Sequence, residues 1–297
     1  MPIAESLRPD GLAAKVEEAL GAALSRLEPL PGRSHSLNFR ATAEDGRMFA
    51  VKLVPLRREA AIRRIVARSR TVADPLSAGP VIPEERIEFD GFRLLCAKWM
   101  DGERKSLDML SDGELESLVL SHRRFLGTLR DDGMLESEFD VGRNLEELLA
   151  LDLPSGLRRE LQEMTATVRD PARTMVIHGD LNPGNLLFRD GKVSAFLDLE
   201  EFRRGLPAED LVRYAISSAE HLKFWQTRRR RRTVERFADM VRLAGFPAED
   251  WTFAVNAFRL RRIRRHIGKD GRVSPFKRIK LRRGLYRAVL EMIDRAG

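Results

Sequence analysis

The stretch MVIHGDLNPGNLLF, residues 175–188, is unusual because a long polar turn separates two short apolar runs. A third apolar run, VSAFLDL at 193–199, follows after the turn RDGK. Short apolar runs bounded by turn residues are typical of buried strands. Most of the chain after residue 100 has helical spacing instead. The fold must therefore insert a small sheet into a helical region, with polar side chains gathered at the strand ends.

The helical part of the chain contains several segments whose apolar residues recur three and four positions apart. The predicted helices are Asp112–Arg130, Asn144–Leu151, Ser155–Val168, Ala208–Leu222, Arg229–Ala244, Ala248–Ile267 and Phe276–Arg295.

The first hundred residues have a different pattern. Apolar spacing predicts a helix over Leu12–Leu27 and another over Leu56–Arg70. Residues 35–54 and 86–100 each alternate around an Asp-Gly turn, which predicts two strand hairpins. The segment 74–83 has three prolines and a glycine and is interpreted as a connection.

These patterns predict an α+β chain with two lobes. Residues 1–98 form a small lobe with a leading helix, an antiparallel sheet and one further helix. Residues 99–297 form a larger, mainly helical lobe that carries the inserted short sheet. A link at Trp99–Gly102 leaves a cleft between the lobes, where small-molecule sites are common.

Composition limits the environment of the protein. Hydrophobic residues make up 43% of the 297 positions, as in ordinary globular chains. We expect no transmembrane segment, because no apolar run is long enough to cross a bilayer. The start of the chain lacks a basic segment followed by an apolar one, and the single cysteine, Cys96, lies in an apolar stretch. A reducing cytoplasm is the expected location.

The polar residues at the strand ends suggest a chemistry. Asp180 and Asn185 are five residues apart across a Pro-Gly turn, and Asp198 lies thirteen further on, after a strand hairpin. Adjacent strand ends would bring the three into one pocket. Carboxylate and amide oxygens suit Mg²⁺, which usually shares its coordination shell with substrate phosphates. One Asp near a nucleophile, with an Asn and an Asp on the metal, is the division of roles in phosphoryl transfer.

The sequence HGDLNPGN followed by LDLE resembles the aminoglycoside phosphotransferase and choline kinase family, the small-molecule branch of the protein-kinase-like fold. This resemblance implies a bilobal protein-kinase-like architecture. It makes Asp180 the catalytic base, with His178 supporting the loop, and makes Asn185 and Asp198 the ligands of Mg²⁺. The phosphate donor would be ATP or GTP.

Other segments extend the resemblance over roughly residues 25–225. FAVKLV resembles the strand whose lysine contacts the nucleotide phosphates, which makes Lys52 that residue and Glu59 its ion-pair partner. GRSHSLNF resembles the phosphate-covering loop, and LCAKWMDG resembles the hinge that binds the nucleotide base. The cofactor-binding residues implied by these segments are Lys52, Glu59, Gly32, Ser34, Ser36, Ala97 and Trp99.

The chain departs from protein kinases at two places. Gly179 stands where protein kinases have arginine, and only twelve residues separate Asp198 from Asp210, for which the resemblance implies a structural role. A protein kinase needs a longer activation segment. Arg130 lies where the family often has histidine. The helices from Arg229 onward carry no recognisable motif, so they leave the acceptor open.

Each residue also has a simpler interpretation. Asp180 and Asn185 belong to a sequence with good turn chemistry by itself. Lys52 could extend along the strand to solvent, and Glu59 could be a solvated carboxylate among arginines. His178 could be a structural histidine, and Glu200 and Glu201 could be solvated. The joint presence of the loop, the second Asp and the upstream Lys favours the functional interpretation.

Charge is unevenly distributed. From His221 onward there are 22 Lys and Arg against 7 Asp and Glu, a net of +15, whereas the first 220 residues carry −7. A solvated basic helix face, an anionic acceptor and a peripheral contact with an anionic membrane surface all fit this excess. Nucleic acid is disfavoured, because aromatic residues do not interleave with the basic ones.

The sequence therefore predicts a Mg²⁺-dependent enzyme that moves the γ-phosphate of ATP or GTP to a hydroxyl of a small molecule or glycan. Charge favours an anionic acceptor, such as a sugar or cell-envelope precursor. The alternative is a non-catalytic kinase-like module that binds an anionic partner through its basic C-terminal helices.

Overall fold

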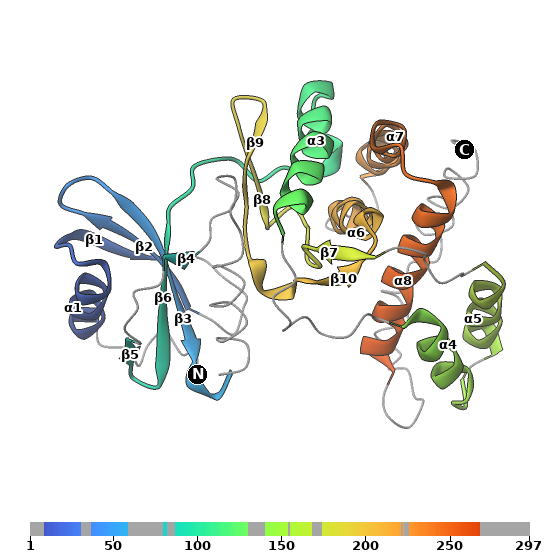
Figure 1. Ribbon diagram of the computed structural model, residues 1–297, viewed down its shortest axis with the longest axis horizontal. Helices are drawn as coiled ribbons and strands as arrows, with labels where there is room; N and C mark the ends of the chain where they lie inside the picture. The colour runs from blue at the N-terminus through green and yellow to red at the C-terminus, as the bar shows by residue number, and fades with distance from the viewer. Residues whose placement is uncertain are drawn as a thin grey trace.

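The computed structural model places a small sheet-containing lobe beside a larger helical one (Figure 1). It describes residues 9–30, 37–58, 80–81, 87–129, 140–153, 155–167, 174–220, 222 and 226–267. This arrangement confirms the predicted α+β class, with a small sheet-containing lobe and a larger helical one. The proposed lobe boundary after residue 98 stays a prediction.

The small lobe contains α1 (Pro9–Leu20) packed on an antiparallel sheet. The strands run in the order β1-β2-β3-β6-β4, with β5 also paired to β6. Their bounds are β1 Leu24–Pro29, β2 Leu37–Ala43, β3 Met48–Pro55, β4 Pro80–Val81, β5 Glu88–Phe89 and β6 Phe92–Lys98. Leu12 and Val16 of α1 join Val51, Leu53 and Cys96 in one buried cluster. That cluster is the core of the small lobe.

Both predicted hairpins of this lobe form, but two predictions nearby were wrong. The helix predicted over Leu12–Leu27 ends at Leu20, and Leu24–Pro29 is a strand paired with β2. Gly21, with a φ of +59°, follows the last helical residue, as glycine often does. Residues 80–81 also form a strand, β4, within the segment interpreted as a connection. In both cases a neighbouring strand supplies hydrogen bonds that local spacing does not reveal.

The larger lobe is mainly helical. Its helices are α3 Asp112–Thr128, α4 Val141–Leu149, α5 Ser155–Thr167, α6 Pro207–Glu220, α7 Thr227–Ala244 and α8 Ala248–His266. They agree with the predicted ones within a few residues. The predicted helix Phe276–Arg295 lies outside the described residues. Of the helix predicted over Leu56–Arg70, only a 3₁₀ turn at Leu56–Arg58 is described.

The inserted short sheet forms where the apolar runs predicted it. Strands β8 (Leu186–Arg189) and β9 (Lys192–Phe196) pair as a hairpin, and β7 (Met175–Ile177) pairs with β10 (Arg203–Gly205), a strand that the spacing did not predict. These strands lie between the sheet lobe and the helices in Figure 1. Their buried residues join the core of the larger lobe, which includes Phe125, Tyr214 and Trp251.

Many of the C-terminal arginines form ion pairs within the protein. Along α8 the pairs are Arg259–Glu160, Arg261–Glu209, Arg262–Glu220 and Arg264–Glu147. On α7, Arg229 pairs with Asp108, Arg231 with Glu235 and Arg236 with Asp112. Six of these arginines therefore link one segment to another, namely Arg229, Arg236, Arg259, Arg261, Arg262 and Arg264, which none of the sequence-based alternatives described.

Among the described residues, no helix has the length and apolar character needed to cross a bilayer.

Candidate active site

The turn between β7 and β8 carries Asp180 and Asn185 in direct contact. The Asn185 amide nitrogen, Nδ2, donates to the Asp180 carbonyl at 2.9 Å and to its carboxylate oxygen Oδ2 at 3.1 Å. Asn182 tightens the same turn, since its side-chain oxygen accepts the Gly184 amide at 2.8 Å. The turn therefore forms the local hydrogen bonds that its sequence predicts. It also brings the side chains of Asp180 and Asn185 into contact.

His178 ties this loop to the segment that carries Asp198. Its Nε2 lies 2.9 Å from the Leu197 carbonyl, and its Nδ1 lies 3.3 Å from the Asp180 amide. A backbone amide can only donate, so Nδ1 accepts and Nε2 carries the proton; this tautomer is assigned from the hydrogen bonds. The ring is fully buried among Phe125, Phe196 and Phe202. His178 thus contacts the loop from its buried side.

Asp210 of α6 anchors the backbone of the same loop. Its two oxygens accept the amides of His178 at 2.9 Å and Gly179 at 2.8 Å, and one of them also meets His122 Nε2 at 3.2 Å. Burial acts to raise the pKa of Asp210, but the hydrogen bond with His122 and nearby positive charge hold that pKa below its ordinary value. An ionised, buried carboxylate therefore fixes the loop on the helical lobe.

Asp198 follows β9 with a left-handed backbone, at φ 60° and ψ 64°. Such a conformation is uncommon for a residue other than glycine and often occurs at functional sites. The neighbouring Leu197 amide donates to the Asn185 carbonyl at 2.8 Å, so the segment ending in Asp198 lies against the loop. The half-exposed carboxylate of Asp198 lies 3.3 Å from Lys52 Nζ. Lys52 comes from β3, so this contact joins the two lobes.

Asn185 and Asp198 fit a shared magnesium ion by their chemistry. Both protons of Asn185 Nδ2 point to Asp180, which leaves the Asn185 amide oxygen for another partner. Asp198 adds a half-exposed carboxylate. Two such ligands with phosphate oxygens and water are a common magnesium arrangement. Among the described residues, no group of three or more His, Cys, Asp and Glu side chains is placed to hold a metal.

The predicted hinge lies at the end of β6. Ala97 pairs with Ala50 of β3 and with Pro80 of β4. The Trp99 amide donates to the Met48 carbonyl at 3.0 Å, so that amide is already engaged, and the Trp99 indole donates to Asp101 at 2.9 Å. Binding of a nucleotide base here stays a prediction. Glu59, Gly32, Ser34, Ser36 and Arg130 lie outside the described residues.

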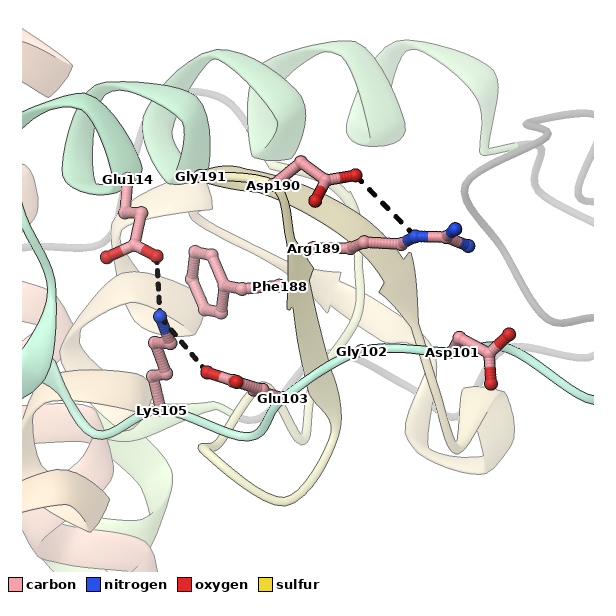
Figure 2. A pocket seen from close by; sticks show the side chains of 9 residues that line it. All are labelled: Asp101, Gly102, Glu103, Lys105, Glu114, Phe188, Arg189, Asp190 and Gly191. Atoms are coloured by element: carbon pink, nitrogen blue, oxygen red, sulfur yellow. Dashed lines mark hydrogen bonds and ion pairs between the residues drawn. The ribbon is translucent and has the colours of Figure 1, made fainter.

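A pocket of about 530 Å³ lies beside this segment but away from the predicted chemistry (Figure 2). Residues after the hinge and the turn of the β8–β9 hairpin line it. Lys105 lies within it, 2.8 Å from Glu114 and 3.3 Å from Glu103. Asp180, Asn185 and Asp198 do not line this pocket. We therefore place the candidate site at the loop, where the motif residues meet.

Sequence reasoning missed two residues at the site. His122 of α3 contacts Asp210, and Arg213 of α6 forms an ion pair with Asp180. Arg213 follows Asp210 by three positions, so both face the same side of the helix. That spacing was available as a signal. No local pattern identifies His122, whose partner is 88 residues away.

Comparison with known proteins gives a family for this arrangement. Residues 26–252 match the model of a family described as "Phosphotransferase enzyme family". No curated protein matches the sequence at a significant level.

Several solved structures share the fold at low sequence identity. Amicoumacin kinase hAmiN, in complex with AMP-PNP, Ca²⁺ and Ami, has a TM-score of 0.64 and 14% identity, over 99% of this chain and 95% of its own. A thermostable mutant of aminoglycoside phosphotransferase APH(4)-Ia, with ADP and hygromycin B, has a TM-score of 0.63 and 13% identity, over 97% and 99%. Macrolide 2'-phosphotransferase MphH from Brachybacterium faecium has a TM-score of 0.58 and 17% identity, over 96% and 98%.

Proposed function

Because the chain belongs to the phosphotransferase enzyme family, we propose that it transfers the γ-phosphate of ATP or GTP to a hydroxyl of a small molecule or glycan. The observation that carries this proposal is the meeting of Asp180, Asn185 and Asp198 at one loop. Lys52 reaches Asp198 from the sheet lobe, and the segment that ends in Asp198 lies against that loop. This arrangement supports a donor between the lobes and an acceptor on the Asp180 side.

In the reaction, the acceptor hydroxyl oxygen forms a bond to the γ-phosphorus while the bridging bond to the β-phosphate breaks, and the nucleoside diphosphate leaves. Asp180 receives the hydroxyl proton and aligns the attacking oxygen. Asn185 holds the Asp180 carboxylate through its amide, and Lys52 binds donor phosphates. Asn185 and Asp198 would hold Mg²⁺, which neutralises phosphate charge when bound.

Positioning supplies much of the rate in such a reaction, because the transition state is loose and needs little covalent chemistry. His178 and Asp210 serve this purpose by fixing the loop backbone from its buried side. The set of Lys52, Asp180, Asn185 and Asp198 is intact, and the family is one of enzymes. Both points favour catalysis over the alternative of a non-catalytic module that binds an anionic partner.

For the acceptor, the basic residues after residue 220, apart from those that pair within the protein, favour an anionic small molecule or glycan, such as a sugar or cell-envelope precursor. The structural neighbours whose names include hygromycin B and a macrolide suggest antibiotics as the second class to assay. A cytoplasmic location and a peripheral contact with an anionic membrane surface remain predictions.

The test is Asp180→Asn, which keeps the shape of the side chain but removes the base. We expect transfer to fall by about 10²- to 10⁴-fold, the usual contribution of general base catalysis. Transfer can be measured as nucleotide consumption with an acceptor panel that includes sugars, amino-alcohols and aminoglycosides.

Asp190→Asn is the matched control. Asp190 is an exposed residue at the β8–β9 turn with a φ of +51°, a conformation that asparagine accepts easily. The control should keep wild-type activity. Full activity of Asp180→Asn, with an unchanged fold, would refute the mechanism.

A further inference from the structure

Arg213 contacts the residue that we propose as the base. Its guanidinium forms an ion pair with Asp180 Oδ1, while Asn185 donates to the other oxygen, Oδ2. The Arg213 guanidinium and Asp180 Oδ1 are close enough to form an ion pair, but the N–H group is not directed at the oxygen as a hydrogen bond requires. Asp180 Oδ1 and Arg213 Nε are therefore both buried without a hydrogen-bond partner in the described part of the chain.

The position of Arg213 follows from the role of Asp180. A base must present its carboxylate to the acceptor hydroxyl, so a side chain that covers one oxygen of that carboxylate borders the acceptor. Arg213 is partly exposed, and its guanidinium carbon lies 6.0 Å from the centre of the Phe258 ring on α8. The guanidinium thus lies between the catalytic loop and α8.

Two further arginines contact Glu209 of α6, which lies four positions and about one helical turn before Arg213. Arg203 of β10 and Arg261 of α8 both contact the same oxygen of the buried Glu209, at 2.9 and 2.8 Å. Burial, followed by repulsion from Arg203 and Arg213, lowers the pKa of Arg261 to about 10. Arg203 and Arg261 thus share one carboxylate oxygen of Glu209, on the same face of α6 as Arg213, and Arg213 repels Arg261.

We propose that Arg213, together with Arg203 and Arg261, binds an anionic group of the acceptor, either a carboxylate or a phosphate. The planar guanidinium offers paired donors to either group. An acceptor anion would draw Arg213 from Asp180 and expose Oδ1 to the acceptor hydroxyl. This inference rests on the proposed function, because it treats Asp180 as the base. It makes Arg213 a specificity-determining residue.

The first test measures anion binding in the full chain by isothermal titration calorimetry. The nucleotide site is first saturated with Mg²⁺ and AMP-PNP, and then inorganic phosphate or acetate is titrated in, so that the two arms separate phosphate from carboxylate. We expect saturable binding of at least one anion to the wild type. We expect at least about tenfold weaker binding to Arg213→Gln.

The controls distinguish anion binding at Arg213 from non-specific attraction of anions to a basic surface. Arg232→Gln removes an exposed arginine of α7 and should bind as the wild type does. Arg213→Lys keeps the charge but loses the planar fork, so its binding should be intermediate; it also replaces Arg213→Gln if that variant does not fold. Unchanged binding by the Arg213 variants, or the absence of saturable binding of either anion to the wild type, would overturn the proposal.

The second test compares matched acceptors: glucose, glucosamine, glucuronate and glucose 1-phosphate. Preference for a charged anionic sugar, lost in Arg213→Gln, supports the inference, and preference for glucose or glucosamine overturns it. If none of the four sugars is phosphorylated, the calorimetric titration alone tests the proposal. If Asp180→Asn keeps full transfer, the proposed function fails. If it abolishes transfer while the Arg213 variants change nothing, only this inference fails.

Discussion

At Gly179, in the loop between β7 and β8, the backbone has a φ of +77°, and a Cβ atom added there would lie 1.9 Å from the Glu201 carbonyl oxygen. The residue between His178 and Asp180 therefore has two reasons to be glycine, namely its backbone conformation and the close approach of another chain segment. An arginine, as in protein kinases, would not fit without moving that segment. The sequence difference noted at this position thus has a steric cause.

We predict that Gly179→Ala destabilises the protein more than Gly191→Ala does. Gly191 has a similar φ of +74° but no atom within 4 Å of an added Cβ. The shared conformational cost is about 1–2 kcal/mol, and overpacking at Gly179 adds about 1–3 kcal/mol. Equilibrium unfolding in urea gives the two free energies of unfolding.

The same pair of variants separates stability from catalysis. Gly179→Ala should also lower transfer by tenfold or more, because a shifted loop misplaces Asp180. Gly191→Ala should keep its activity. Equal unfolding free energies in the two variants would mean that the Glu201 contact relaxes without cost.

At the scale of elements, helix α8 is held by its arginines. Pairs with Glu160 of α5, Glu209 and Glu220 of α6, and Glu147 of α4 extend from one helix to three others. The pairs differ in burial. Arg259 and Glu160 are 13% and 9% exposed, whereas Arg264 and Glu147 are 44% and 40% exposed. We expect a buried pair to affect the free energy of unfolding more than an exposed pair does.

We expect Arg259→Met to lower the free energy of unfolding by about 3 kcal/mol, because it leaves Glu160 buried without this ion-pair partner. Arg264→Met should produce no measurable change, since water and salt already screen its pair. Both values come from urea unfolding at low and at high salt. A larger loss in Arg264→Met than in Arg259→Met would contradict this ranking.

At the scale of the whole molecule, Lys52 and Asp198 connect the lobes across the predicted donor site. A nucleotide bound there would contact both lobes, so its binding free energy would stabilise them together. At one hundred times its Kd, a ligand adds about 2.7 kcal/mol to the free energy of unfolding.

We therefore predict that AMP-PNP with Mg²⁺ raises the unfolding temperature of the wild type in a single transition, and that Lys52→Met loses most of this shift. Lys15→Met, which changes an exposed lysine of α1, should keep it. Differential scanning calorimetry measures both. Two separate transitions, only one of which moves with nucleotide, would show that the lobes do not unfold together.

Features set by residues close together in the sequence could be predicted, whereas features set by distant residues could not. The strands around residues 175–199 and the helices of the large lobe were predicted because turn residues and apolar spacing encode them within short windows. Strand β1 was interpreted as helix because Leu20, Leu24 and Leu27 also fit helical spacing. Only the hydrogen bonds to β2 select the strand.

The candidate site also contains contacts within one motif, which could be predicted, and contacts between distant residues, which could not. The loop motif placed Asp180 and Asn185 together, as the structure has them. The contacts of Arg213 with Asp180 and of His122 with Asp210 join residues that are far apart in sequence. Such contacts depend on how helices pack, which a single sequence does not state. The roles of the site residues stay predictions until the variants above are measured.

Asp210 and Arg213 lie one turn apart on α6, and this spacing bears on how the protein can diverge. Asp210 accepts hydrogen bonds from the His178 and Gly179 amides, whereas Arg213 pairs with the Asp180 carboxylate. With the role proposed for Arg213, we expect mutations at position 213 to alter the choice of acceptor while the loop keeps its backbone position. Related enzymes could then acquire new acceptors through substitutions on one turn of α6 and keep the same phosphate transfer.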